Sequence, residues 1–117
     1  MSQITTHVLD ISLGRPAAGI KITLQKMCDL DGSSIVETIG KGVTNADGRI
    51  NDLMANNKSL EKGRYRLNFE LAEYFAANGS EVFFPIAEVI FALDGDSKHY
   101  HIPLLISPFG YSTYRGS

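Results

Sequence analysis

Two histidines near the end of this sequence have the type and spacing for acid–base chemistry. His99 and His101 stand two positions apart in a run of alternating polar and apolar residues. Because side chains of a β-strand alternate between faces, both point away from the core, roughly 7 Å apart. Histidine titrates near neutral pH, so the pair suits proton transfer. A solvated pair on an outer sheet, or a zinc site completed by further ligands, are the alternative interpretations.

His7 and Arg49 are the other candidates outside the chain end. His7 lies in a run, residues 5–11, with apolar side chains on both faces, so the face that meets the core stays open. Such strands are often covered on both sides, and a second subunit is one possible cover. Arg49 follows a turn at residues 45–48, where a solvated strand-end arginine is the ordinary interpretation. The same interpretation applies to Tyr114 and Arg115 in the chain end.

The elements that must position these residues are mostly strands. Strand-like runs recur about every ten residues between turn signals, which is typical of an all-β sandwich or barrel. We expect a single domain over residues 1–117 with eight strands and one short helix. The expected strands are residues 5–11, 20–28, 34–44, 49–53, 64–70, 83–93, 99–106 and 111–116, and the expected helix is residues 71–77.

Alternation also predicts which side chains form the core. In the strand at 99–106 the inward row is Tyr100, Ile102, Leu104 and Ile106. In the strand at 64–70 it is Tyr65, Leu67 and Phe69. Turn residues at 14–16 are expected to stop the first strand, and residues 29–33 are expected to form another turn.

Composition narrows the class of protein. The 117 residues are 44% hydrophobic and 21% charged, with a net charge of -2. Acids and bases are interspersed, so neither a nucleic acid nor a membrane surface is an expected partner. No run approaches the ~18 apolar residues of a membrane span, and no signal peptide is expected at the start. The single cysteine, Cys28, fits a reducing compartment, so the cytoplasm is the expected location.

Several segments together resemble the transthyretin family. The N-terminal signature corresponds to HVLD at residues 7–10 and GRPA at 14–17. The C-terminal signature corresponds to YHIPLL at 100–105, SP at 107–108 and YST at 111–113. The resemblance spans the whole chain and implies a prealbumin-like β-sandwich of two four-stranded sheets with one short α-helix.

Within that family, the chain resembles the 5-hydroxyisourate hydrolase branch. That branch is marked by a histidine in the first signature, an arginine after the central turn, a His-x-His pair and a Tyr-Arg-Gly-Ser end. The resemblance implies hydrolysis of 5-hydroxyisourate to 2-oxo-4-hydroxy-4-carboxy-5-ureidoimidazoline in urate catabolism. Water would attack a ring carbonyl and a C–N bond would open. The implied catalytic residues are His7, Arg49 and His101, and the implied substrate-binding residues are His99, Tyr114, Arg115, Gly116 and Ser117.

The resemblance also implies a homotetramer with active sites between dimers, and neither metal nor cofactor. Two other functions stay open. One is a transthyretin-like carrier of small hydrophobic or hormone-type ligands, which would favour an apolar channel. The other is a zinc hydrolase using His7, His99 and His101.

Overall fold

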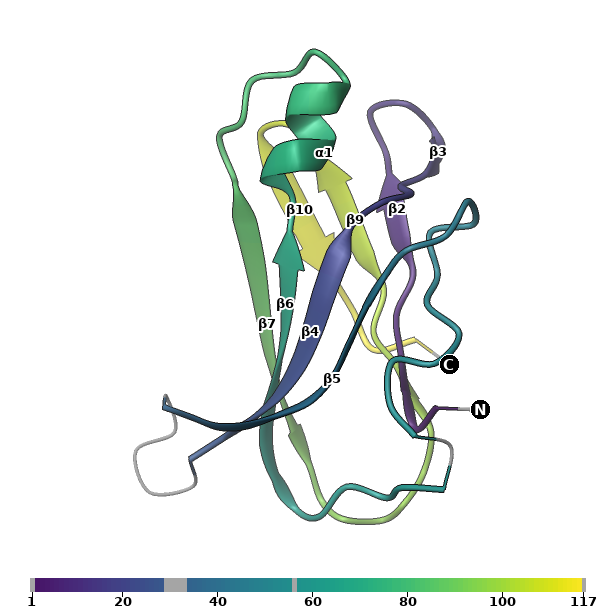
Figure 1. Ribbon diagram of the computed structural model, residues 1–117, viewed down its shortest axis with the longest axis vertical. Helices are drawn as coiled ribbons and strands as arrows, with labels where there is room; N and C mark the ends of the chain where they lie inside the picture. The colour runs from purple at the N-terminus through teal and green to yellow at the C-terminus, as the bar shows by residue number, and fades with distance from the viewer. Residues whose placement is uncertain (1, 29–33, 56, 117) are drawn as a thin grey trace.

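Two four-stranded sheets pack face to face, with one short helix at one end (Figure 1). The computed structural model describes residues 2–28, 34–55 and 57–116. The predicted turn at residues 29–33 lies outside this part of the chain. The elements are β1 (Ile4–Thr5), β2 (Val8–Asp10), β3 (Arg15–Pro16), β4 (Lys21–Met27), β5 (Ile35–Val43), β6 (Gly63–Glu70), α1 (Ala72–Ala77), β7 (Ile86–Leu93), β8 (Tyr100–His101), β9 (Leu104–Ser107) and β10 (Gly110–Thr113).

The two sheets differ in the direction of their strands. One has the order β5-β4-β6-β7 and is antiparallel throughout. The other has the order β10-β9-β2-β3, in which β2 and β9 run parallel. A third, two-stranded ladder pairs β1 with β8, also in parallel. The predicted all-β sandwich of two four-stranded sheets with one short helix is confirmed.

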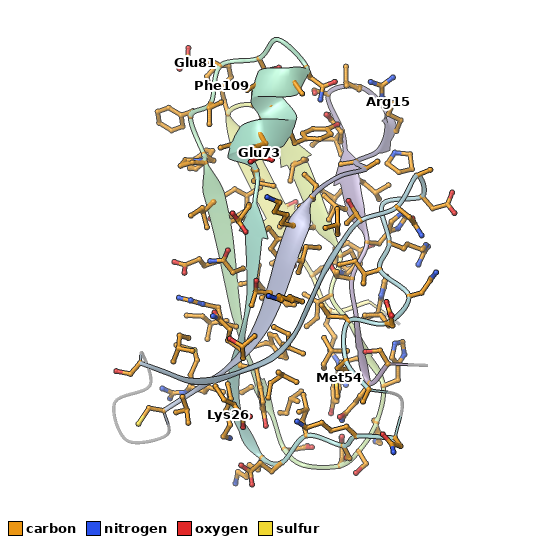
Figure 2. All side chains as sticks on the ribbon, viewed as in Figure 1. Arg15, Lys26, Met54, Glu73, Glu81 and Phe109 are labelled. Carbon is orange, nitrogen blue, oxygen red and sulfur yellow. The ribbon has the colours of Figure 1, made fainter. Side chains whose placement is uncertain are left out.

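The core forms where the inner faces of the two sheets meet. All of the residues predicted to face inward on β6 and along residues 100–106 are buried: Tyr65, Leu67, Phe69, Tyr100, Ile102, Leu104 and Ile106. Figure 2 shows the two ends of this sandwich, with Phe109 and Glu73 near α1 and Met54 toward the other end. Because alternation fixes the opposite face as well, His99 is exposed and His101 is half-buried outside the core.

One predicted strand is wrong. Residues 49–53 contribute only an isolated bridge between Arg49 and His7. The edge of the second sheet is formed by β3, which pairs with Leu9 and Asp10. Residues 14–16 were predicted only to end the first strand, but Arg15 and Pro16 also form β3, which pairs with β2. Pro16 lacks a backbone N–H, which an edge strand tolerates.

The first and penultimate predicted strands are each divided in two. Residues 5–11 become β1 and β2, and residues 99–106 become β8 and β9. The second break falls at Ile102 and Pro103, where proline removes a ladder donor. The pieces still run side by side, because the Ile102 N–H donates to Thr5 O and the Leu104 N–H donates to His7 O, both at 2.9 Å. This places both histidine-bearing segments next to each other.

The helix α1 ends at Ala77, as predicted, and Asn78 is its C-cap residue. It attaches to the second sheet through Tyr74, whose hydroxyl donates to Asp10 Oδ2 at 2.7 Å. In the described part of the chain no helix has the length and apolar character needed to cross a membrane.

Candidate functional site

The candidate site forms where three segments distant in sequence meet at the outer face of β1 and β8. The turn at Asn45–Arg49 reaches β2 through the bridge between His7 and Arg49, and the Val8 N–H donates to Gly48 O at 2.8 Å. The end of the chain reaches β8 on its other side. There the Gly116 N–H donates to His101 O at 2.7 Å. In Figure 1 the two marked chain ends accordingly lie on the same side, in the half away from α1.

Gly48 allows the turn to pack directly against His7. Its φ is +74°, and a Cβ at this position would lie 2.4 Å from Val8 O and 3.3 Å from His7 Cδ2. Only glycine adopts this conformation at this proximity without strain. The turn itself is closed by Asn45, whose side-chain oxygen accepts from the backbone N–H groups of Asp47 and Arg49. Arg49 is thereby fixed next to His7.

Thr5 joins the two later histidines. Its Oγ1 lies 2.8 Å from His99 Nε2 and 2.8 Å from His101 Nδ1. The two imidazole rings are stacked, with centroids 6.5 Å apart and planes inclined by 30°. Thr5 stands opposite His101 in the parallel ladder, which is why its hydroxyl reaches both rings.

A cavity of about 430 Å³ opens over these residues. It is bounded by side chains that accept or donate hydrogen bonds, with one apolar wall from Ile50. The lining residues are Thr5, Thr6, Arg49, Ile50, Asn51, His99 and His101. Its size suits a small heterocycle, and its polar lining suits a substrate with several oxygen and nitrogen atoms.

The cavity's surroundings keep His101 neutral. Burial lowers the pKa of His101 below its ordinary value of 6.5, and electrostatic interaction with Arg49, His99 and His7 lowers it further. A hydrogen bond with the Thr5 backbone raises the pKa and only partly opposes these effects. At neutral pH the imidazole is therefore available to accept a proton.

Residues at the end of the chain contact two different sites. Gly116 lies against His101, and a Cβ on it would come within 2.8 Å of His101 Cδ2. The side chains of Tyr114 and Arg115 instead line a second cavity, of about 240 Å³, between β7 and the chain end. Arg115 stacks over the Tyr100 ring, with its guanidinium carbon 4.7 Å from the centroid. Ser117 lies outside the described residues.

The described part of the chain has no group of three or more histidine, cysteine, aspartate or glutamate residues arranged to hold a metal ion. The structure thus brings together His7, Arg49, His99, His101 and Gly116. It does not bring the side chains of Tyr114 and Arg115 into the same cavity of the same chain.

The sequence was compared with known families and structures. It matches the model of the HIUase/Transthyretin family over residues 4–116. The chain belongs to this family. It is 42% identical to the 5-hydroxyisourate hydrolase of Halalkalibacterium halodurans over 119 residues, covering 98% of each chain. It is 39% identical to the 5-hydroxyisourate hydrolase of Deinococcus radiodurans, covering 97% of this chain and 95% of that one.

Solved structures with a similar fold include a 5-hydroxyisourate hydrolase and a transthyretin. The Klebsiella pneumoniae 5-hydroxyisourate hydrolase superposes with a TM-score of 0.81 at 41% identity, covering 100% of both chains. Sea bream transthyretin in complex with thyroxine superposes with a TM-score of 0.86 at 31% identity, covering 98% of this chain and 95% of that one. The backbone of this chain is about equally similar to the hydrolase and to the transthyretin. The sequence and the cavity must therefore distinguish hydrolysis from ligand transport.

For this family member, sequence reasoning missed four residues that line the cavity: Thr5, Thr6, Ile50 and Asn51. Thr5 had a weak signal, since it precedes His7 by two positions and so shares its face in a strand. Ile50 and Asn51 fall in the predicted strand at residues 49–53, which does not form. The wrong prediction gave no indication that these two residues line the cavity.

Proposed function

We propose that the chain catalyses hydrolysis of 5-hydroxyisourate to 2-oxo-4-hydroxy-4-carboxy-5-ureidoimidazoline. One observation carries this proposal. Arg49, His99 and His101 line one cavity of about 430 Å³, and His7 adjoins Arg49 there. Hydrolysing a cyclic amide requires a base for water, a group that holds the ring and a stabiliser for the oxyanion.

The residues divide these tasks according to their chemistry. His101, neutral at pH 7, accepts a proton from water as the water oxygen attacks the ring carbonyl. Arg49 presents a planar fork that binds two oxygen atoms at once and stabilises the negative charge developing on the carbonyl oxygen. His7, bridged to Arg49, is the second group able to exchange protons with the leaving ring nitrogen. When the C–N bond opens, that nitrogen gains a proton and the carbonyl carbon becomes a carboxylate.

We propose a homotetramer as the working form. Edge strands β7 and β10 are open in the single chain, and large apolar side chains lie exposed near them. Ile90 on β7 and Phe109 beside β10, for example, are 56% and 66% exposed. Exposed apolar surface of this kind marks protein–protein contacts. Light scattering of the purified protein tests this, and a monomer at micromolar concentration would contradict it.

The proposed site is completed by the chain end. His99 and Gly116 contribute from the same chain, and Tyr114, Arg115 and Ser117 are proposed to contact substrate in the assembled tetramer. We further propose one domain over residues 1–117, because a single core joins both sheets, and a cytoplasmic location, since Cys28 is the chain's only cysteine.

A carrier function is the weaker candidate. Identity to the hydrolases reaches 41–42%, against 31% to sea bream transthyretin. The polar cavity lining also favours chemistry over storage of an apolar ligand.

The direct test follows the decay of freshly generated 5-hydroxyisourate by absorbance, with and without the protein. Catalytic amounts of protein are expected to accelerate the decay in proportion to their concentration. Decay at the spontaneous rate, with tight stoichiometric binding of an aromatic ligand, would favour the carrier.

A further inference from the structure

The hydroxyl of Thr5 stands between His99 Nε2 and His101 Nδ1, 2.8 Å from each. A hydroxyl carries one proton. It therefore donates to one ring nitrogen and accepts an N–H from the other. The two hydrogen bonds consequently fix the tautomers of both histidines together, and only two arrangements are possible when both rings are neutral.

The proposed role of His101 as a base is compatible with only one of these arrangements. With Nδ1 engaged by Thr5, Nε2 is the ring nitrogen of His101 that remains for water or substrate. Nε2 can act as a base only if the proton of the neutral ring sits on Nδ1. That proton then donates to Thr5 Oγ1, and the Thr5 hydroxyl donates to His99 Nε2.

We propose that Thr5 is a positioning residue that holds His101 in the Nδ1–H tautomer and links it to His99. This inference deepens the proposed function and rests on it. The charged and titratable groups around His101 are Arg49, His99 and His7. Thr5 Oγ1, and none of these groups, is the hydrogen-bond partner of His101 Nδ1.

The same geometry provides a route for the proton. When His101 Nε2 takes a proton from water, the Nδ1 proton can pass to Thr5 Oγ1 while the Thr5 proton passes to His99 Nε2. His101 then carries one proton, Thr5 is unchanged and His99 carries two. His99 is exposed, so it can release its extra proton to solvent.

A first test needs no variant. Nitrogen-15 NMR of the histidine rings in the full-length protein, without substrate and at a pH where His101 is neutral, reports which nitrogen is protonated. We expect the His101 proton on Nδ1. A proton on Nε2 overturns the inference, whatever the protein's activity.

A second test removes the hydroxyl. Thr5→Val keeps the shape of the side chain, and Thr5→Ser keeps the hydroxyl. We expect Thr5→Val to lower kcat roughly tenfold with a smaller change in KM, and to shift the His101 ring toward the Nε2–H tautomer. Thr5→Ser should restore both. Thr23→Val, a half-buried threonine on β4 in the other sheet, is the matched control and should change neither.

The outcomes separate this inference from the proposed function. A wild-type protein that fails to accelerate 5-hydroxyisourate decay overturns the proposed function, and the NMR measurement still tests the tautomer. A Thr5→Val protein with either an unchanged kcat or an unchanged His101 tautomer overturns the role of Thr5. If Thr5→Val does not fold, the wild-type spectrum decides.

Discussion

Gly116 offers a way to move the proposed base without altering its chemistry. A Cβ at this position would lie 2.8 Å from His101 Cδ2, 3.2 Å from His101 O and 3.3 Å from His101 Cβ. Ordinary contact begins at 3.4 Å, so in Gly116→Ala the imidazole and the chain end must separate by about 0.6 Å. The backbone on either side of His101 is held in the β1–β8 ladder, where the Tyr100 N–H donates to Gln3 O and the Ile102 N–H donates to Thr5 O, so the ring is the part expected to shift.

The kinetic effect should exceed the effect on stability. A misplacement of 1 Å in a catalytic geometry costs up to about 10²-fold in rate, so 0.6 Å predicts a loss of roughly tenfold in kcat. Gly116 is only half-buried and lies at the chain end, so the melting temperature should change little. Gly110→Ala is the matched control, because a Cβ there would meet only Ser107 Oγ, at 3.8 Å.

The assay is the initial rate of 5-hydroxyisourate decay over a range of substrate concentrations, with thermal unfolding measured on the same samples. Wild-type kcat in Gly116→Ala would refute the claim that this contact holds His101 in its working position. A loss of activity equal in both glycine variants would point to a general effect on the chain end instead.

Three further predictions follow from the same contacts. Substituting His101 or His7 with Gln, or Arg49 with Ala, should each reduce kcat/KM at least tenfold with the fold retained, as judged by circular dichroism. In a plot of kcat/KM against pH, the midpoint of the acid limb should lie below pH 6.5, because burial and then Arg49 lower the pKa of His101. A midpoint above pH 6.5 would contradict the role of His101 as the base. Burial raises the pKa of Asp10, but hydrogen bonds, including one from Tyr74, hold it below 3.8 overall. Its contribution to stability is therefore present above about pH 4 and lost as pH falls through the folded-state pKa. Asp10→Asn should cost about 1–3 kcal/mol at pH 7, and the difference should shrink in acid.

Much of the sandwich could be predicted from sequence because alternation is a local property. The rows that include Tyr65 and Tyr100 each follow from a period of two within one strand, and both are buried as expected. The face of His7 was undetermined, because Leu9 gives its row an apolar member. In the structure Val8 is buried and His7 faces outward, beside the turn that carries Arg49.

The contacts that assemble the site could not be predicted, since they join residues far apart in the chain. Thr5 reaches His99 and His101 across 94 and 96 positions, and only the parallel pairing of β1 with β8 brings them together. The predicted turn before Arg49 is confirmed, but the strand predicted to follow it, at residues 49–53, does not form. The turn signal fixes only the local backbone, and not the partner to which Arg49 bridges.

The chain end connects the site to the proposed assembly. Gly116 bridges to His101, so the preceding residue faces the other side of β8, where Arg115 stacks on Tyr100. Alternation thus prevents one chain from presenting both Gly116 and Arg115 to its own histidine cavity. Tyr114 lines the second cavity together with Arg115, so both can contribute to substrate binding only at a cavity to which a second copy contributes. Their proposed role and the proposed tetramer therefore depend on each other. An active, strictly monomeric protein would remove Tyr114 and Arg115 from the site while leaving His7, Arg49 and His101 in place.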